Sequence, residues 1–227
     1  MSKKGRKRKK RNRKWNAANL RQDLRHYTDL SALLHLLVKK KLTLRDPENW
    51  DDVNDRHYLT LYKESRQLKS VLALCFVRSS ERYHFWRVFA GGRGGVRIRF
   101  KRRPLLDAIQ AQPGLRWGRV VYQRLDKIGT VPIDQFPFVK RHGFKDEKEF
   151  RIIYESSIKV AKLDIPIPLS CIHSIKLSSW LHPDLFSDIR KVLHSVEGCD
   201  SMHIVRSNLI DNEKWKKAGD NALVGQV

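Results

Sequence analysis

A run of seven apolar residues, from Val71 to Val77, constrains the fold of this chain more than any other feature. Side chains of a strand alternate between its two faces, so a strand that is apolar at every position must be covered on both. The run is also far shorter than the roughly 20 residues that cross a bilayer. The sequence therefore predicts a buried strand over 69–77, with other parts of the fold packed on both of its faces.

Shorter patterns predict the elements around this strand. Alternating or apolar segments predict strands over 24–28, 42–44, 96–100, 117–122, 148–154, 171–177 and 202–205. Helical spacing and capping residues predict helices over 29–41, 56–68, 83–89, 104–112 and 182–194, with Thr28 and Ser79 or Ser80 as caps. These elements follow no strict βαβ rhythm, so we expect an α+β fold with a mixed, mainly antiparallel sheet and flanking helices.

The expected domain organisation is one α+β domain over 20–210 between two polar ends. Residues 124–138 and the segment around Pro166 and Pro168 are predicted to be loops, and residues 211–227 a polar tail that frays. The three cysteines, Cys75, Cys171 and Cys199, have no metal-ligand spacing, which fits a reducing compartment, and Cys75 and Cys171 are expected to be small buried side chains in apolar strands. With no signal peptide and no membrane segment in the pattern, we expect a cytoplasmic protein without a membrane partner.

Positive charge is concentrated at the N-terminus. The formal net charge is +23, and ten basic residues lie within 3–14: Lys3, Lys4, Arg6, Lys7, Arg8, Lys9, Lys10, Arg11, Arg13 and Lys14. Removing these ten charges leaves +13, so the rest of the chain is basic too. Residues 1–19 are expected to form a disordered arm that binds nucleic-acid phosphates, with solvated disorder of no dedicated role as the alternative.

Two carboxylates, Glu147 and Glu149, stand two residues apart where the 148–154 strand is expected to begin. In extended chain both point the same way, and a carboxylate pair on a rigid element suits general acid/base chemistry. From spacing alone, the plainer interpretation is that Glu147, Glu149 and Arg151 form the solvent-facing side of an antiparallel strand.

An acidic stretch precedes the predicted 56–68 helix: Asp46, Glu48, Asp51, Asp52 and Asp55. Acids at a helix start usually cap the helix or interact with its dipole. A metal-dependent nuclease would instead group Asp51 and Asp55 with Glu147 and Glu149, although no cluster has clear ligand spacing and no metal is expected.

Six motifs occur in an order that resembles domain-of-unknown-function family 2971 of bacterial and phage proteins. They are Leu24-Arg-His-Tyr-Thr-Asp-Leu30, Pro47…Trp50…Asn54-Asp55, Ala73-Leu-Cys-Phe76, Trp86-x-x-Phe89, Gly95-Val-Arg-Ile-Arg-Phe100 and Glu147-x-Glu149-x-Arg151. The resemblance runs from about Leu20 to Ser207, and Ser207-Asn-Leu209 with Trp215 is similar to a C-terminal signature of one branch.

His26-Tyr27-Thr28, followed by a leucine-rich helix, also resembles the opening of the ADP-ribosyltransferase fold. That resemblance implies that His26 on the first strand holds the ribose or phosphates of NAD, and that Glu149 on a later strand does the catalysis. The middle position, a Ser or Tyr, should fall near 75–77. Val77 stands where many relatives have Ser, so Tyr27 or Tyr83 would have to substitute.

The same resemblance implies roles for other side chains. Glu147 would be a second carboxylate, Arg151 would orient the pair or grip phosphate, and Thr28 would assist His26. Tyr83 or Trp86 could floor a pocket for a base. The implied function is transfer of ADP-ribose from NAD or a related nucleotide, with nucleic acid as an acceptor and phage–host conflict as a setting. A non-catalytic nucleic-acid-binding protein is the alternative, and the metal nuclease is the second.

Overall fold

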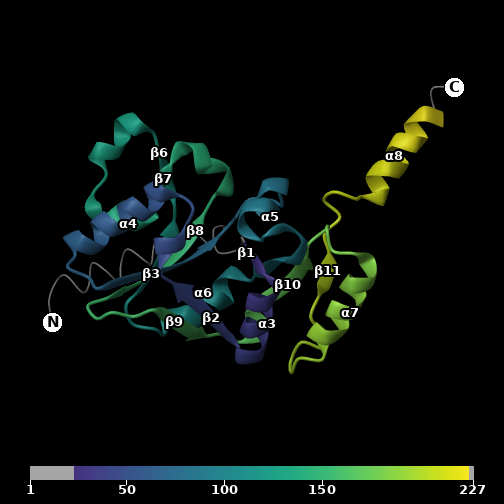
Figure 1. Ribbon diagram of the computed structural model, residues 1–227, viewed down its shortest axis with the longest axis horizontal. Coiled ribbons are helices and arrows are strands. Elements are labelled where there is room, and N and C mark those ends of the chain that lie inside the picture. Colours follow the sequence, from purple (N-terminus) through teal and green to yellow (C-terminus); the bar gives the residue numbers. More distant parts are fainter. Residues whose placement is uncertain (1–22, 225–227) are drawn as a thin grey trace.

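The computed structural model describes residues 23–224, so the predicted basic arm over 1–19 lies outside the described residues. Within that range the chain forms the predicted α+β fold with mainly antiparallel strands, which are divided between two main sheets where one was expected (Figure 1). No helix in the described part combines the length and the apolar character needed to cross a membrane.

The first sheet has four strands in the order β1-β4-β10-β11. They are β1 (Leu24–Asp29), β4 (Gly95–Phe100), β10 (Ile172–Leu177) and β11 (Ile204–Arg206). β4 runs antiparallel to both of its neighbours, and β11 runs parallel to β10.

The second sheet has five antiparallel strands in the order β5-β8-β3-β2-β9. They are β5 (Leu115–Arg119), β8 (Phe150–Ser156), β3 (Ser70–Phe76), β2 (Lys41–Arg45) and β9 (Lys162–Pro166). The apolar run that was predicted as a buried strand is β3, in the middle of this sheet. Its central place explains why no position of the run is polar.

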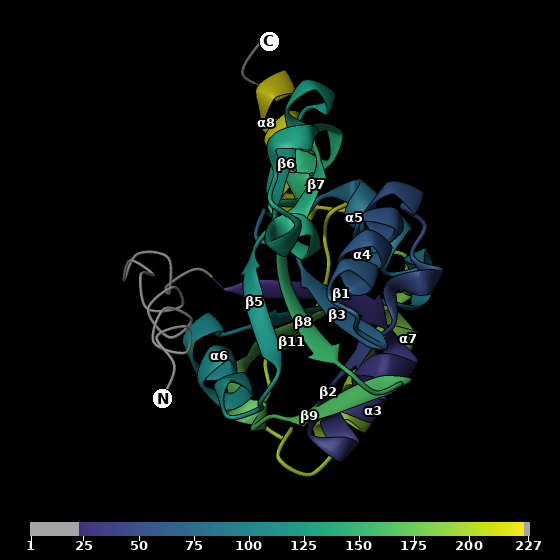
Figure 2. The ribbon, with the colours of Figure 1, turned by 90° about the vertical axis from the view of Figure 1, so that its left-hand side faces the viewer.

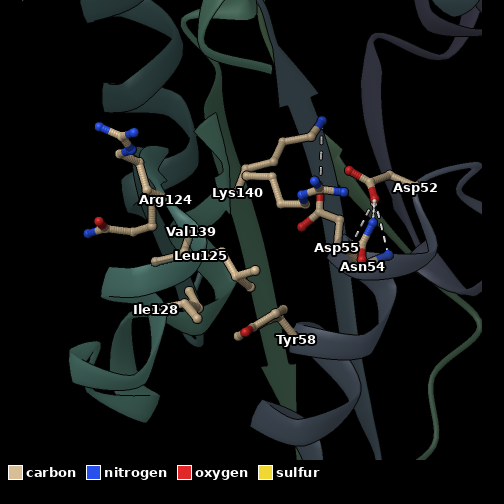
Figure 3. A pocket seen from close by; sticks show the side chains of 11 residues that line it. Asp52, Asn54, Asp55, Tyr58, Arg124, Leu125, Ile128, Val139 and Lys140 are labelled. Carbon is tan, nitrogen blue, oxygen red and sulfur yellow. Dashed lines mark hydrogen bonds and ion pairs between the residues drawn. The ribbon is translucent and has the colours of Figure 1, made fainter. Parts of the chain in front are cut away.

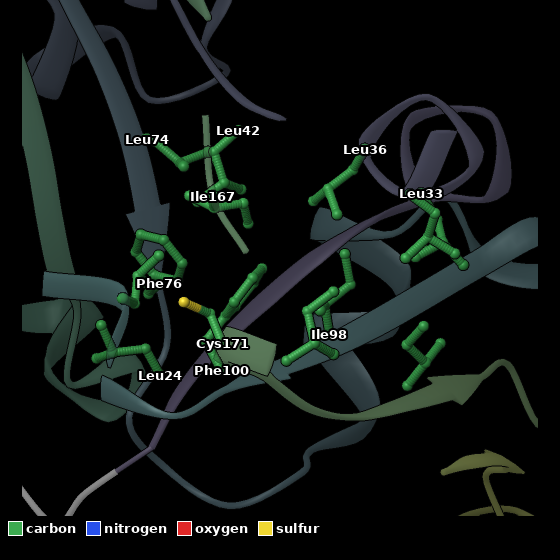
Figure 4. Packing of buried hydrophobic residues seen from close by; sticks show 14 of the residues in the cluster. Leu24, Leu33, Leu36, Leu42, Leu74, Phe76, Ile98, Phe100, Ile167 and Cys171 are labelled. Atoms are coloured by element: carbon green, nitrogen blue, oxygen red, sulfur yellow. The ribbon is translucent and has the colours of Figure 1, made fainter. Parts of the chain in front are cut away.

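A single bridge joins the two sheets. The N–H of Arg25 donates to the carbonyl of Val77 at 3.0 Å, and the N–H of Val77 donates back to the carbonyl of Arg25 at 2.7 Å. Beyond this bridge β1 and β3 part, and the main hydrophobic core fills the space between the sheets. Ile98 and Phe100 of the first sheet meet Leu74 and Phe76 of the second in this core (Figure 4).

Five helices pack against the sheets. They are α3 (Leu30–Lys39), α4 (Val53–Ser65), α5 (Tyr83–Phe89), α6 (Arg102–Gln110) and α7 (Pro183–His194), and α8 (Glu213–Val224) follows them in the described part of the chain. The side chain of Asp29, and not of Thr28 as predicted, caps α3 by accepting from the Ala32 N–H at 2.8 Å. The predicted Ser79 or Ser80 cap of α5 is also wrong, because Arg82 holds that position.

Three predicted loop or tail segments are structured. Residues 124–138 contain 3₁₀ helices over Leu125–Thr130 and Ile133–Phe138, and the segment before Pro166 is the edge strand β9. The C-terminal segment forms α8, which projects from the body at the upper right of Figure 1.

A small ribbon lies at one end of the second sheet, beside α4 (Figure 2). It pairs β6 (Val121–Gln123) with β7 (Val139–Arg141) in parallel. The chain then forms a 3₁₀ helix over His142–Glu147, and Lys148 takes a left-handed conformation with φ of 48°. The predicted strand over 148–154 therefore starts later, at Phe150, and Glu147 stands on a turn before it.

Candidate active site

A cleft of about 640 Å³ opens where β1 and β3 part. His26 and Thr28 of β1 form one wall, together with the start of α3. The opposite wall comes from β2 and from Cys75 at the end of β3, and Trp50 stands at the edge. Two cations, Lys41 and Arg45, lie on the β2 side and favour an anionic ligand.

His26 is held in one protonation state at the cleft wall. Its Nδ1 lies 2.9 Å from the carbonyl oxygen of Cys75, which can only accept, so Nδ1 carries the proton. Burial lowers the pKa of His26, although the bond to the Cys75 carbonyl opposes that shift. The ring is therefore neutral at neutral pH, and Nε2 is left as a hydrogen-bond acceptor that suits a sugar hydroxyl.

Cys75 connects the cleft to Glu149. Its thiol lies on the same face of the second sheet as the side chains of Glu149 and Arg151, because Cys75 and Arg151 are directly paired on β3 and β8. Burial raises the pKa of the Cys75 thiol well above its ordinary value, and the negative charge of Glu149 adds to the shift. The thiol is thus protonated and hydrogen-bonds to the Glu149 carboxylate.

Glu149 belongs to a buried network of three carboxylates and two cations. Arg151 donates to Glu149 Oε1 at 2.8 Å and to both oxygens of Asp55 at 2.8 and 3.0 Å. Lys140 reaches Glu147 at 3.0 Å, Glu149 at 3.6 Å and Asp55 at 3.9 Å. The interpretation of Glu147, Glu149 and Arg151 as a solvent-facing side is wrong, since all three are buried.

The two glutamates have pKa values shifted in opposite directions. Burial raises the pKa of Glu147 to about 7; the charge of Lys140 opposes this and that of Glu149 adds to it. Burial would raise the pKa of Glu149 as well, but Arg151 and then Lys140 outweigh it and lower that pKa to about 2. One carboxylate therefore stays ionised while its neighbour titrates near neutral pH, a division of roles that acid/base enzymes use.

Trp50 separates the network from the cleft. Its ring lies over the Arg151 guanidinium, with 5.0 Å between the guanidinium carbon and the ring centroid, and the same side chain lines the cleft. Glu149 is 3% exposed behind this cover. A ligand in the cleft reaches the carboxylate only past Trp50 and Cys75.

A second, smaller cavity of about 310 Å³ lies on the other side of the network. Tyr58 and the start of α4 form one wall, and the apolar side chains of Leu125, Ile128 and Val139 form the facing wall (Figure 3). Lys140 lines this cavity and also contacts the buried carboxylates. The network is thus flanked by a cavity on each side.

Five of the residues expected at the site lie at the cleft or in the network next to it. His26 and Thr28 line the cleft, and Glu149, Glu147 and Arg151 belong to the network that Cys75 joins to it.

The other three lie elsewhere. Tyr27 and Trp86 are buried in a small cluster under α5, on the opposite face of β1 from His26, and Tyr83 is half exposed beside Trp180. Arg151 is fully buried, and its donors bind Asp55, Glu149 and the carbonyl of Pro137, so it faces no ligand space.

The acidic stretch before α4 serves mainly as caps. Asp46 and Asp52 accept backbone N–H groups at the starts of a 3₁₀ helix and of α4. Asp55 instead pairs with Arg151, so the guanidinium and Lys140 occupy the space between Asp55, Glu147 and Glu149. Among residues 23–224 no group of three or more His, Cys, Asp or Glu side chains is arranged to hold a metal ion.

Sequence reasoning missed Lys140, Trp50 and Arg45 as site residues. Asp55 was expected at a helix start, or as a ligand in the alternative metal nuclease, and not as the partner of Arg151. Trp50 appeared only as part of a motif, and nothing marked Lys140, which follows a segment expected to be a loop. The available signal was charge, since Asp55 can pair with Arg151 and Lys140 with Glu147. Asp55, however, lies 96 residues before Arg151, and Lys140 lies seven residues before Glu147 on a separate ribbon.

No family model matches the chain, and no curated protein matches it, so the likeness to domain-of-unknown-function family 2971 stays a prediction. Among solved structures, Thermus sp. 2.9 DarT in complex with ADP-ribosylated ssDNA aligns with a TM-score of 0.44 and 10% identity, covering 82% of this chain and 94% of that chain.

The same DarT in complex with NAD+ aligns with a TM-score of 0.44 and 9% identity, and in complex with carba-NAD+ with 0.42 and 10%. Each alignment covers 82% of this chain and 96% of that chain. At these values the likeness decides neither the substrate nor the reaction of this chain.

Proposed function

We propose that this protein is an ADP-ribosyltransferase-like enzyme that takes NAD or a related nucleotide into the cleft between β1 and β3. One observation carries the proposal: neutral His26 on one wall of the cleft contacts Cys75 on the opposite wall, and the Cys75 thiol is hydrogen-bonded to the buried carboxylate of Glu149. The cleft thus has a hydrogen-bond acceptor for a sugar hydroxyl at His26, an ionised carboxylate behind Cys75, and two cations on its β2 side. The sequence resemblance implied roles for the same two residues, His26 and Glu149, which supports the proposal.

The roles in binding follow from the chemistry of each group. Nε2 of His26 accepts a hydrogen bond from a ribose hydroxyl, and the Thr28 hydroxyl lies on the same wall. Lys41 and Arg45 attract the diphosphate. The Trp50 side chain moves aside to let the sugar reach Glu149.

The proposed reaction breaks the bond between C1′ of the ribose and the nicotinamide nitrogen. Nicotinamide leaves with the bonding electron pair, which makes the sugar cation-like, and the ionised Glu149 stabilises that charge. An acceptor nucleophile then forms a new bond to C1′. Its proton passes to Glu147, whose pKa of about 7 suits a general base.

Cys75 takes the middle position in this proposal. The resemblance placed a Ser or Tyr near 75–77 and drew attention to Val77, but Val77 packs in the cluster under α5. The Cys75 thiol is the group that hydrogen-bonds to Glu149, so Cys75 is proposed as a positioning residue. Neither Tyr27 nor Tyr83 is needed for that role.

The test is label transfer from radiolabelled NAD, with single-stranded DNA, RNA or lysate as acceptors. Glu149→Gln keeps the shape and removes the charge, and we expect at least a 100-fold loss of both nicotinamide release and transfer. Glu197→Gln is the matched control, because that carboxylate is 91% exposed and pairs only with the surface residue Lys40 among the described ion pairs. Full turnover by Glu149→Gln would falsify the proposal.

A non-catalytic nucleic-acid-binding protein is the second candidate, and the formal charge of +23 favours it. Deleting residues 1–19 separates the two. An enzyme should keep its turnover of NAD after this deletion while its DNA or RNA binding weakens. A protein that only binds nucleic acid should show no NAD turnover before or after the deletion.

A further inference from the structure

The outer face of the first sheet carries a row of basic and hydrogen-bonding side chains. Because Leu24, Ile98, Phe100, Ile175 and Ile204 point into the core, their neighbours in sequence point away from it. Arg25 on β1 lies opposite Arg99 on β4, and Arg99 lies opposite Ser174 on β10. His203 extends the row, since its carbonyl accepts from the Ile175 N–H at 2.9 Å. We call Arg25, Arg99, Ser174 and His203 the open row.

Like charges face each other directly in the open row. Cross-strand pairs of one sign destabilise a sheet, so an arginine opposite an arginine needs a compensating anion. Asp23 supplies one carboxylate, which pairs with Arg99, while Arg25 donates to the backbone carbonyls of Asp23 and Arg78. The exposed Lys101 stands at the same end of β4 and adds a third cation.

The next row along the same face shows what a neutralised arrangement looks like. Arg97 on β4 faces Lys176 on β10, again two cations, but Glu81 pairs with both at 3.5 and 2.7 Å. Their side chains are 11% and 20% exposed, against 39% for Arg99. We call Arg97 and Lys176 the covered row. Its charges are neutralised by Glu81, whereas the charges of the open row face solvent.

Electrostatics agree with this geometry. Burial lowers the pKa of Arg25, and the positive charges of Arg97 and Arg99 lower it further, although Asp23 opposes them. Repulsion among these cations is relieved when an anion binds across them. The hydroxyl of Ser174 and the ring of exposed His203 are further groups that commonly contact phosphate oxygens.

The open row also lies next to the basic N-terminal segment in the chain. Arg25 is the second residue of β1, and the ten Lys and Arg residues over 3–14 precede it by eleven residues or more. The open row is therefore close along the chain to the strongest concentration of positive charge in the sequence, and both could contact the same polyanion.

We propose that the open row binds the phosphate backbone of a nucleic-acid strand. This inference concerns binding alone and does not depend on NAD chemistry in the cleft, which lies on the opposite face of β1. Under the proposed function, the same surface would hold the nucleic acid that carries the acceptor.

The experiment measures binding of a fluorescent single-stranded DNA oligomer to the full chain over a salt series. Arg25→Gln/Arg99→Gln removes two charges from the open row. The control, Arg103→Gln/Arg190→Gln, removes two charges from exposed positions on α6 and α7. We expect the log–log salt slope of the row variant to fall by about 1.4, at about 0.7 per lost contact, with the control unchanged. Equal slopes for the two variants would overturn the proposal.

A second variant guards against misfolding of the first. Ser174→Glu adds a negative charge to the open row without removing either arginine, and we expect it to weaken DNA binding at low salt and not at high salt. An unchanged affinity would count against the proposal. Anionic phospholipid vesicles serve as the rival partner: weaker vesicle binding with unchanged DNA binding in the row variant would assign the surface to a membrane and overturn the proposal.

Failure here and failure of the proposed function are distinguishable. The row variant should release nicotinamide from NAD at the wild-type rate, since the open row touches no part of the cleft. Conversely, Glu149→Gln should bind DNA with the wild-type salt slope. An RNA oligomer run in parallel shows whether the backbone preference is for DNA or RNA.

Discussion

Two charge networks in this protein, one partly buried around Glu81 and one buried behind the cleft, differ in their balance of acids and bases. Glu81 is a single carboxylate that receives four donors: Trp86 at 2.9 Å, Ser207 at 2.5 Å, Lys176 at 2.7 Å and Arg97 at 3.5 Å. In the network behind the cleft, three carboxylates share Lys140 and Arg151.

The pKa shifts follow this balance. Burial would raise the pKa of Glu81, but Lys176, Ser207 and Arg97 lower it, so Glu81 stays ionised. In the network with surplus acid, burial raises the pKa of Asp55 and that of Glu147. Around Glu81 every carboxylate oxygen has donors, so that network stabilises the fold. The network of Asp55, Glu147 and Glu149 has three carboxylates and two cations, so one carboxylate holds a proton that it can exchange near neutral pH.

The largest expected effect comes from removing the shared cation. Arg151→Met leaves Asp55 and Glu149 buried without their bidentate and single ion pairs. Breaking a buried pair on one side costs about 3–5 kcal/mol, so the free energy of unfolding should fall by that amount in urea denaturation. A loss under 1 kcal/mol would mean that the network contributes little to folding.

Removing the hub of the other network should cost less and leave chemistry untouched. Glu81→Ala strands Arg97 and Lys176 and breaks the bonds to Trp86 and Ser207. We expect a loss of about 2–4 kcal/mol in stability by thermal or urea unfolding. Nicotinamide release per folded molecule should stay at the wild-type value. A changed pH profile of nicotinamide release would show that the Glu81 network takes part in the chemistry, which this comparison denies.

The surplus acid should appear in the pH dependence of stability. In the unfolded chain Glu147 loses its proton near pH 4.5, but in the folded chain near pH 7. Its stabilising contribution is thus full below pH 4.5 and is lost as the pH rises through 7. Glu147→Gln stays neutral throughout, so its stability relative to wild type should increase by on the order of 2 kcal/mol from pH 4.5 to 7.

Glu149 has the opposite sign. With its pKa lowered to about 2, the contribution of Glu149 to stability is present above pH 4.5 and is lost as the pH falls toward 2.

The prediction for Glu147 is contradicted if the difference in stability between Glu147→Gln and wild type is constant from pH 4.5 to 7. Glu147 is then not the group that holds the surplus proton.

The smallest effect concerns the link between cleft and carboxylate. Cys75→Ser keeps a donor to Glu149 and Cys75→Ala removes it, so the alanine variant should lose about tenfold in turnover while the serine variant keeps most of it. The pH profile of turnover should also shift in Cys75→Ala alone. Cys199→Ser is the control for thiol loss away from the site. Equal turnover of the Ser and Ala variants would show that Cys75 does not position Glu149.

Local patterns predicted much of this fold because the signals were local. The apolar run at 71–77 could only be a covered strand, and the leucine spacing after Thr28 gave α3 to within a residue or two. The edge strand β9 was missed because Pro166 suggested a break, yet Pro is tolerated at the last position of an edge strand.

The candidate site was less accessible, because its charges come from distant segments. The sequence drew attention to Glu149 and His26 but gave no reason to bury Glu147 or Arg151. Their partners are Asp55 on α4, 96 residues before Arg151, and Lys140 on β7, whose ribbon has no strong pattern. A charged side chain is buried where an oppositely charged partner lies beside it, and which partner lies there is decided by the fold.

The most direct test of the central claim is nicotinamide release from NAD by wild type, Glu149→Gln and Glu81→Gln, each confirmed as folded by circular dichroism. The account predicts turnover by wild type and by Glu81→Gln, and at least a 100-fold loss in Glu149→Gln. Absence of turnover by the wild type, or equal losses in the two variants, would contradict it.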